Sequence, residues 1–219
     1  MAYDCGPLDR SIEETLAALR DGLAREYRLE RRPIYRCSPR KARRLRRIGG
    51  WRRAADRLIF EAGRVARETL PRIERDTAHT FPGPDGLLRV LMDPSTKRLF
   101  FGLLAGFPEE ALPVPAHDLA RLGAFSDDAR ALALIGDVTL RLKVLSGPEA
   151  EVRDLAALSD RWDLHESLIG LLCRRRPAGE TLLREKETLA RAVLGLIYVE
   201  GGADALRRAV PLLVPGPAG

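Results

Sequence analysis

Asp137 is an acid in an otherwise apolar stretch, directly after Gly136 in the run Ala-Leu-Ala-Leu-Ile-Gly-Asp-Val-Thr-Leu. Leu132, Ile135 and Leu142 recur at helical spacing, which predicts a buried or nearly buried helix. An acid in such a helix needs a partner, because an unpaired buried charge is costly. Asp137 is therefore either part of a cap or an internal salt bridge, or it is a metal ligand or a general base.

A second stretch, at residues 188–202, reads Thr-Leu-Ala-Arg-Ala-Val-Leu-Gly-Leu-Ile-Tyr-Val-Glu-Gly-Gly. The two stretches together resemble the paired signature helices of the ribonuclease III family. One of those helices carries a Leu-Gly-Asp-Ala-Val-Leu type run, and the other a Glu-Ala-Leu-Ile-Gly-Ala-Ile-Tyr-Leu-Asp-Gly-Gly type run. The order, the separation of roughly half a hundred residues and the trailing Gly-Gly agree, and the resemblance covers about residues 119–213. The amino-acid sequence of the first stretch is most similar to that of the mini ribonuclease III branch.

The resemblance implies a helical domain that pairs into a homodimer and cuts double-stranded RNA with magnesium. In such a site carboxylates hold the ion, which neutralises charge and activates water. Asp137 falls on the Gly-Asp acid of the family. Ala133 stands where other branches carry a further acid, although the mini branch tolerates alanine there. On the second helix the essential glutamate falls on Arg191, and the aspartate three residues before it falls on Thr188.

Arg191 puts a fixed cation where the family has a magnesium ligand. It would repel a divalent ion and attract Asp137, so an interhelical salt bridge between Asp137 and Arg191 is expected. If that pair is buried, breaking it from one side costs about 3–5 kcal/mol. Glu187, one turn before Arg191, is the acid that could restore a catalytic pair with Asp137, which would then bind magnesium; otherwise Glu187 pairs with Arg191 on its own helix. Further candidate acids are Asp127, Asp128 and Glu185.

The densest basic tract runs from Arg36 to Arg57, where Asp56 is the only acid among ten cations. So many positive charges repel each other unless an anion is bound, which favours nucleic acid or another polyanion over a solvated face. A second basic cluster, at residues 174–176, precedes the second signature helix. The candidate RNA-binding residues are Arg40, Lys41, Arg43, Arg44, Arg46, Arg47, Arg52, Arg53, Arg174, Arg175 and Arg176.

Several start and stop signals bound the expected helices. Ser11 and Glu14 form a capping box before a helix that runs to about Leu29. Ser38-Pro39 is a cap followed by proline at the first helical position. Gly49-Gly50 is expected to break the basic tract, so that a second helix starts near Trp51 and is ended or kinked by Pro71.

The expected fold class is mostly α, with a basic helical N-terminal region before the ribonuclease III-like helical domain. The expected divisions are 1–78 for the basic region, 79–116 for a linker, 117–214 for the domain and 215–219 for a tail. In the linker, two apolar runs flank Asp93-Pro94 and predict either a β-hairpin or two short helices. After it, helices are expected at 118–122, from Ser126 as a cap to about Gly147-Pro148, and then at 152–158, 164–173, 181–199 and 203–213.

Composition adds limits on compartment and class. The 219 residues carry a formal charge of +6, and hydrophobic residues make up 45%, as in an ordinary soluble protein. No run approaches the ~18 apolar residues of a membrane span, and no secretory signal is visible. The three cysteines form neither a zinc pattern nor a disulfide framework, which fits a cytoplasmic protein. His79, His117 and His165 are far apart in sequence and are interpreted as surface or capping residues.

Three functional hypotheses remain open. The first is a non-cleaving protein without a cofactor that binds structured or double-stranded RNA and could act in a ribonucleoprotein. The second is an active magnesium-dependent endoribonuclease that uses a rearranged set of acids. The third is a helical scaffold that only dimerises.

Overall fold

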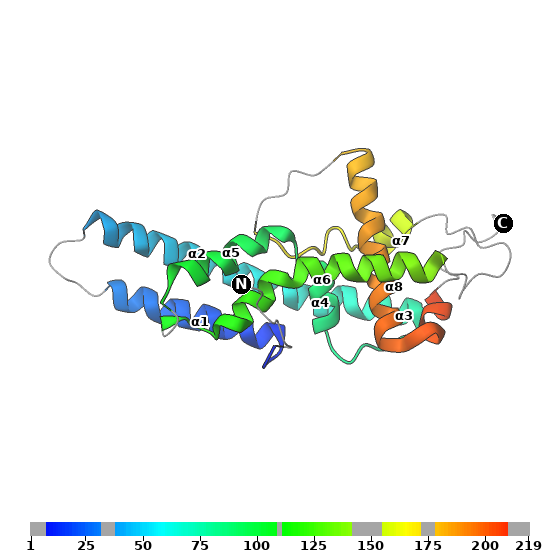
Figure 1. The fold of residues 1–219 in the computed structure, drawn as a ribbon, viewed down its shortest axis with the longest axis horizontal. Helices are drawn as coiled ribbons and strands as arrows, with labels where there is room; N and C mark the ends of the chain where they lie inside the picture. Colours follow the sequence, from blue (N-terminus) through cyan, green and yellow to red (C-terminus); the bar gives the residue numbers. More distant parts are fainter. Residues whose placement is uncertain (1–7, 32–37, 109–110, 142–154, 172–177, 210–219) are drawn as a thin grey trace. The chain divides into compact units, whose positions relative to one another are not determined.

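A computed structural model describes residues 8–31, 38–108, 111–141, 155–171 and 178–209, and these residues are mostly α-helical. The helices in chain order are α1 (Ile12–Arg31), α2 (Pro39–Arg64), the π-helical η1 (Val65–Thr69), α3 (Leu70–Thr77), α4 (Asp85–Leu91), the 3-10 helix η2 (Pro94–Thr96), α5 (Lys97–Gly106), α6 (Ala116–Arg141), α7 (Leu155–Arg161) and α8 (Glu180–Ala209) (Figure 1). None of the helices in these ranges combines the length and the apolar character that crossing a bilayer requires.

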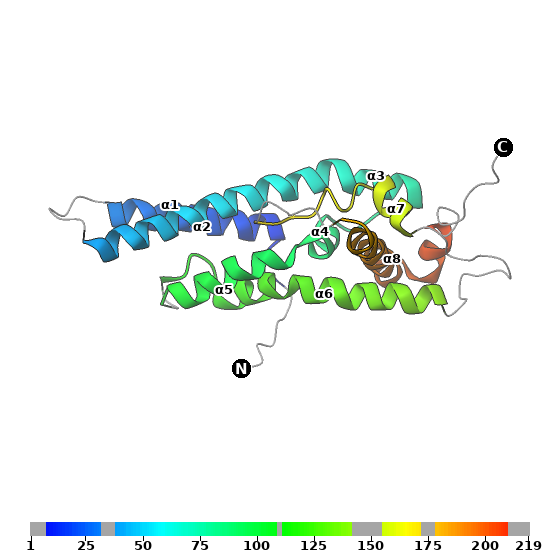
Figure 2. The ribbon, with the colours of Figure 1, turned by 90° about the horizontal axis from the view of Figure 1, so that it is seen from above.

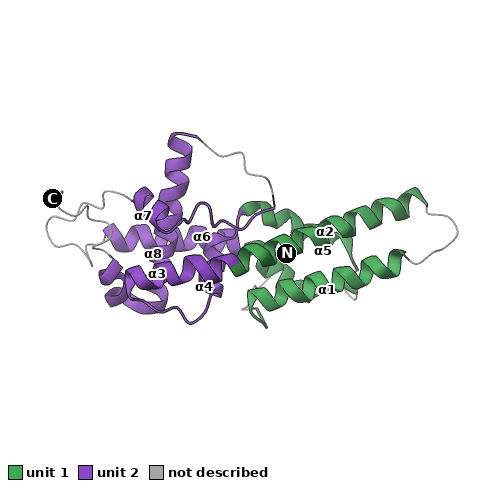
Figure 3. Ribbon diagram, turned by 180° about the vertical axis from the view of Figure 1, so that it is seen from behind, with its two compact units in different colours: residues 1–63, 94–124 green, residues 64–93, 125–219 purple. Residues whose placement is uncertain are grey.

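The chain forms two compact units that each combine separate segments (Figure 3). Unit 1 comprises residues 1–63 and 94–124, and unit 2 comprises residues 64–93 and 125–219. The sequence suggests consecutive regions divided near residues 79 and 117. The observed division falls elsewhere because segments on both sides of the expected linker contribute to each unit.

In unit 1, α1 and α2 lie side by side (Figures 1 and 2). α1 begins at the expected capping box: Glu14 N–H donates to Ser11 Oγ at 3.2 Å, and Ser11 N–H donates to Glu14 Oε2 at 3.1 Å. Its fully buried stripe is Ile12, Leu16, Leu19 and Leu23. This i, i+4, i+7, i+11 spacing places the apolar side chains on one face of the helix.

α2 also begins as expected, because Lys41 N–H donates to Ser38 Oγ at 3.2 Å. The expected break at Gly49-Gly50 is wrong, since α2 runs through both glycines without interruption. Gly49 is buried, and a Cβ there would lie 3.4 Å from the ring of Tyr27. The helix therefore packs against Tyr27 at this position and continues despite the weak helix propensity of glycine.

The helical path also continues past Pro71. Leu70 N–H donates to Val65 O across the π-helical turn η1, and Pro71 then occupies the first turn of α3. A proline in the first turn needs no backbone N–H partner, so the wider turn before it avoids the break that proline causes in a helix interior. α3 ends at Ala78, which has a left-handed φ of 50°.

In unit 2, α8 packs against α7, α4 and α3. The last helix bends at Gly202, whose φ of 70° and ψ of −169° interrupt it where the sequence predicts a stop after the second signature helix. Trp162, directly after α7, is fully buried, and its indole N–H donates to Asp76 Oδ2 at 3.1 Å. The described side chains of each unit thus form an apolar core between helices.

The apolar runs around Asp93-Pro94 form α4 and α5, the helical one of the two alternatives that the sequence left open, and the described residues contain only one isolated bridge, between Met92 and Ile169. Two other expectations are wrong. The helix expected at 164–173 is absent from its described part, where residues 164–167 form turns and Ile169 forms the isolated bridge. α6 is a single helix from Ala116, so Ser126 is a buried residue inside it and not a cap. The end expected at Gly147-Pro148 lies outside the described residues.

Candidate functional sites

Two glycines let α6 and α8 cross in backbone contact within unit 2 (Figure 1). A Cβ on Gly136 would lie 2.0 Å from the carbonyl oxygen of Arg191, and a Cβ on Gly195 would lie 2.0 Å from that of Leu132. These distances are far below any real Cβ contact. Only residues without a side chain fit at this crossing, so the two stretches singled out in the sequence meet here.

The crossing brings Asp137 and Arg191 together. Arg191 Nε lies 3.4 Å from Asp137 Oδ1, so the interhelical ion pair expected from the sequence is present. Each side chain is 28% exposed, and the Arg191 Nε–H makes no directed hydrogen bond to any described residue. The pair is thus not fully buried. Its contribution is closer to the roughly 0.2–1 kcal/mol of an exposed pair than to the larger cost expected for a buried one.

Two further side chains extend the pair into a chain of four charges. Arg141 Nε lies 2.9 Å from Asp137 Oδ2, one turn further along α6. Glu187 Oε2 accepts a hydrogen bond from an Arg191 terminal nitrogen at 3.2 Å. Glu187 therefore pairs with Arg191 on its own helix, and the four side chains carry two positive and two negative charges. The arrangement is electrically neutral.

The other acids proposed from the sequence have partners elsewhere. Asp127 lies 3.9 Å from Arg130 on α6, and Glu185 lies 3.4 Å from His165. Thr188, at a further acid position of the family, donates its hydroxyl proton to Arg184 O. Within the part of the chain that the structure describes, Asp137 belongs to no group of three metal-ligating side chains. With a guanidinium within 3.4 Å of its carboxylate, this crossing does not fit a magnesium ion.

On α2, the eight basic residues expected to bind RNA differ in their surroundings. Three of them contact their own helix pair: Arg44 lies 3.1 Å from Glu30, and Arg47 and Arg52 lie over the rings of Trp51 and Tyr27. Lys41 is half-buried. The remaining four are exposed and make no ion pair with any described residue: Arg40, Arg43, Arg46 and Arg53. Arg174, Arg175 and Arg176 lie outside the described residues.

Arg43, Arg46 and Arg53 form what we call the arginine row. At 100° per residue they fall within about 80° of one another around α2 and span roughly 15 Å along it. Four of the five buried residues of α2 point roughly the opposite way, namely Ile48, Ala55, Leu58 and Ala62, whereas buried Gly49 lies at the edge of the row. Gly50 lies on the same face as the row, and a Cβ there would meet no atom within 4 Å. The row is therefore an open, positively charged helix face.

Away from the α6–α8 crossing, three titratable groups of unit 2 have shifted pKa values: Asp76, His79 and Glu200. Hydrogen bonds from Arg161 and then Trp162 lower the pKa of Asp76. Burial lowers the pKa of His79, and the nearby charge of Arg208 lowers it further. Burial raises the pKa of Glu200, and the charge of Arg89 opposes that rise.

His117 is a surface residue, as expected, but two acids lie beside it. Its Nε2 lies 3.2 Å from Asp9 Oδ2 and 3.4 Å from Asp118 Oδ1. Sequence reasoning missed this cluster because Asp9 is 108 residues from His117 along the chain. The neighbouring His-Asp pair at the start of α6 was the one local signal for it.

Comparison with known proteins adds no relative: no family model, no curated protein and no solved structure matches this chain.

Proposed function

We propose that this chain binds structured or double-stranded RNA through the arginine row of α2 and does not cleave it at the α6–α8 crossing. The observation that carries the proposal is the row itself: Arg43, Arg46 and Arg53 are exposed on one helix face and make no ion pair with any described acid. Guanidinium groups bind phosphates through paired, charge-assisted hydrogen bonds. A phosphate backbone would supply the negative charge that the surrounding residues lack.

Two features favour a backbone ligand over a merely solvated face. The row extends along one direction for roughly 15 Å, a length that covers several phosphates of one strand. Gly50, between Arg46 and Arg53, leaves the helix surface open at its centre, so a backbone could approach closely. That the nucleic acid is RNA rather than DNA rests on the ribonuclease III resemblance.

The absence of cleavage follows from the charges at the crossing. Phosphodiester hydrolysis by this family needs a divalent ion, and Arg191 directs its guanidinium at the one acid that aligns with the family's site. Arg141 pairs with the other oxygen of the same carboxylate. A metal ion would have to displace two cations before it could bind Asp137.

The binding test compares two triple variants that lose the same charge. One removes the row (Arg43→Gln, Arg46→Gln, Arg53→Gln). The other removes three exposed arginines of unit 2, each paired with an acid on its own helix: Arg141, Arg184 and Arg207. Fluorescence anisotropy with a labelled 20-base-pair RNA duplex should show about a 10- to 100-fold weaker affinity for the row variant and little change for the control. Equal losses in both variants would contradict a role for the row.

The cleavage test uses the same duplex with magnesium or manganese. The expected result is intact RNA for the parent protein. Cleavage by the parent that disappears in Asp137→Asn would overturn the non-cleaving part of the proposal and establish the endoribonuclease alternative. Binding and cleavage are thereby scored separately.

Dimerisation is the second candidate function, and exposed apolar side chains on α6 favour it. Leu134 is 64% exposed and Val138 is 41% exposed, one turn apart on the outer face of the helix. Exposed apolar neighbours of this kind often mark contact surfaces. We propose a homodimer that uses this face, and sedimentation velocity of the parent and of Leu134→Lys measures it. A monomeric parent protein at micromolar concentration would exclude the scaffold hypothesis.

A further inference from the structure

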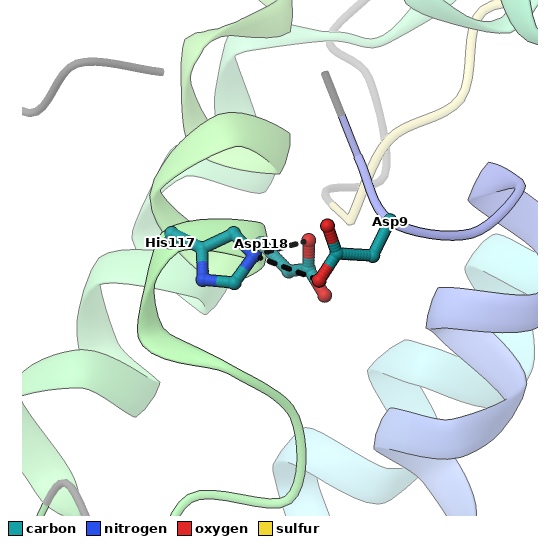
Figure 4. Close-up of side chains that lie close together, drawn as sticks. All are labelled: Asp9, His117 and Asp118. Carbon is teal, nitrogen blue, oxygen red and sulfur yellow. Dashed lines mark hydrogen bonds and ion pairs between the residues drawn. The ribbon is translucent and has the colours of Figure 1, made fainter. Parts of the chain in front are cut away.

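Three potential metal ligands converge in unit 1, and none of them belongs to the arginine row (Figure 4). Asp9 lies in the bend before α1, and His117 and Asp118 occupy the first turn of α6. The ligand atoms of the three side chains all lie within 4.8 Å of one another. Among the described residues this is the only group of three histidine, cysteine or acidic side chains with such spacing.

Asp118 is the residue of the three whose surroundings most favour a cation. Its side chain is 4% exposed, and its Oδ1 makes no hydrogen bond with any residue that the structure describes. The start of a helix favours an acid, but it does not supply a donor to that oxygen. A buried carboxylate oxygen without a donor is costly unless a positive charge neutralises it. A protonated His117 or a metal ion could supply that charge.

We propose that Asp9, His117 and Asp118 bind a divalent transition-metal ion, with zinc as the best fit. An imidazole nitrogen with two carboxylates suits zinc and other first-row ions, whereas magnesium and calcium prefer oxygen-only ligands. Ligands about 2.0–2.2 Å from a tetrahedral zinc lie about 3.3–3.6 Å apart. His117 Nε2 lies 3.2 Å from Asp9 Oδ2 and 3.4 Å from Asp118 Oδ1, close to those separations.

A small cavity beside the cluster leaves room for a fourth ligand. Its volume is about 110 Å³, and both carboxylate residues, Asp9 and Asp118, line it together with Arg10 and Thr15. One water occupies roughly 30 Å³ in the liquid, so the cavity can hold a metal-bound water. Three protein ligands and a water complete a tetrahedral site.

The site would also connect two parts of unit 1 that are distant in sequence. Asp9 precedes α1, whereas His117 and Asp118 begin α6, so one ion would cross-link the two segments. Ligands that bind only the folded state raise stability in proportion to the logarithm of their concentration over Kd. Zinc should therefore raise the melting temperature of the protein as well as bind to it.

Isothermal titration calorimetry with zinc chloride and the full chain tests the proposal, with magnesium chloride as the hard-ion comparison. We expect one equivalent of zinc and no magnesium at this site. Single variants Asp9→Asn, His117→Gln and Asp118→Asn should each weaken zinc binding at least about 10- to 100-fold, because loss of even an outer-shell partner has effects of that size. Cobalt should give the visible absorption bands of a tetrahedral site in the parent protein.

Two controls separate this site from adventitious binding. Asp21→Asn removes an exposed acid of unit 1 that pairs with Arg20, and His165→Gln removes a histidine of unit 2 that pairs with Glu185. Both should bind zinc as the parent does. Asp9 and His117 are exposed, so their variants should fold even if Asp118→Asn does not. No stoichiometric zinc binding, or binding that survives both Asp9→Asn and His117→Gln, would overturn the proposal.

Discussion

The arginines of this chain do different things in two regions. At the α6–α8 crossing, Arg141 and Arg191 both lie within ion-pair distance of Asp137. On the outer face of α2, Arg43, Arg46 and Arg53 make no ion pair with a described acid. The same residue type therefore neutralises an internal acid in one place and leaves an open positive surface in the other. What decides its role is the acid within reach, and not the overall excess of basic residues.

Glycine shows the same contrast between the regions. Gly136 and Gly195 are enclosed by the backbone of the opposite helix, whereas Gly50 on α2 has open space around it. In the first region glycine is required because the backbones of α6 and α8 lie in contact. In the second region no contact within the protein requires glycine, and it lowers helix stability because glycine is a weak helix former.

The largest expected loss of stability comes from adding a side chain at the α6–α8 crossing. In Gly136→Ala the new Cβ would meet the carbonyl oxygen of Arg191, a backbone atom that cannot rotate away. We expect the free energy of unfolding to fall by about 3 kcal/mol or more, the upper range for overpacking. Urea denaturation followed by circular dichroism measures the change.

Gly50→Ala is the matched control for that variant. It makes the same chemical change in an open helix position, so the free energy of unfolding should rise by about 0.5–1 kcal/mol. A loss of stability in Gly50→Ala, or an unchanged Gly136→Ala protein, would break the contrast between the enclosed and the open glycine.

The next largest loss of stability is expected at Asp76, an acid that is more buried than Asp137 and also pairs with an arginine. The side chain of Asp76 is 15% exposed, and its Oδ2 accepts hydrogen bonds from Arg161 Nε at 2.6 Å and from Trp162 Nε1 at 3.1 Å. Asp76→Asn should lower the free energy of unfolding by about 1.5–3 kcal/mol at pH 7, the net range for hydrogen bonds to charged groups. Denaturation followed by tryptophan fluorescence measures it, since Trp162 is fully buried.

The pH dependence of that loss has a definite sign. Arg161 lowers the pKa of Asp76 below its ordinary value of 3.8. The folded state therefore binds the proton less readily, and the stability it gains is present above pH 3.8 and disappears as pH falls through the lowered pKa. Parent and Asp76→Asn should converge in stability at low pH. A constant difference from pH 7 to pH 2 would show that the effect is packing rather than charge.

The smallest expected effect is the coupling between Asp137 and Arg191. Both side chains are 28% exposed, so a double-mutant cycle with Asp137→Asn and Arg191→Gln should give a coupling energy of about 0.2–1 kcal/mol. Urea denaturation at low and high salt measures it, and salt should reduce it. A coupling above about 3 kcal/mol would be that of a buried pair and would contradict the observed exposure.

Features that depend on a few neighbouring residues could be predicted from the sequence. The capping box of Ser11 and Glu14, the cap at Ser38 and the bend at Gly202 depend on a few neighbouring residues, and each is present. The pairing of Asp137 with Arg191 was also expected, because the resemblance aligned two stretches that meet in the family.

Features that depend on tertiary contacts could not be predicted from the sequence. Gly49 looked like a break because the Tyr27 ring that packs on it lies on another helix. Ser126 looked like a cap because its burial inside α6 is set by surrounding segments. The cluster of Asp9 with His117 spans 108 residues and has no periodic pattern. Such contacts depend on the packing of distant segments, which a spacing rule does not capture.

The salt dependence of RNA binding tests the central contrast between the two sets of arginines most directly. Removing one arginine that binds a phosphate should reduce the slope of log K against log salt by about one. The triple variant of Arg43, Arg46 and Arg53 should therefore have a slope about three units shallower than the parent protein. The variant of Arg141, Arg184 and Arg207 should keep the parent slope. Equal slopes for the parent and the arginine-row variant would contradict the account.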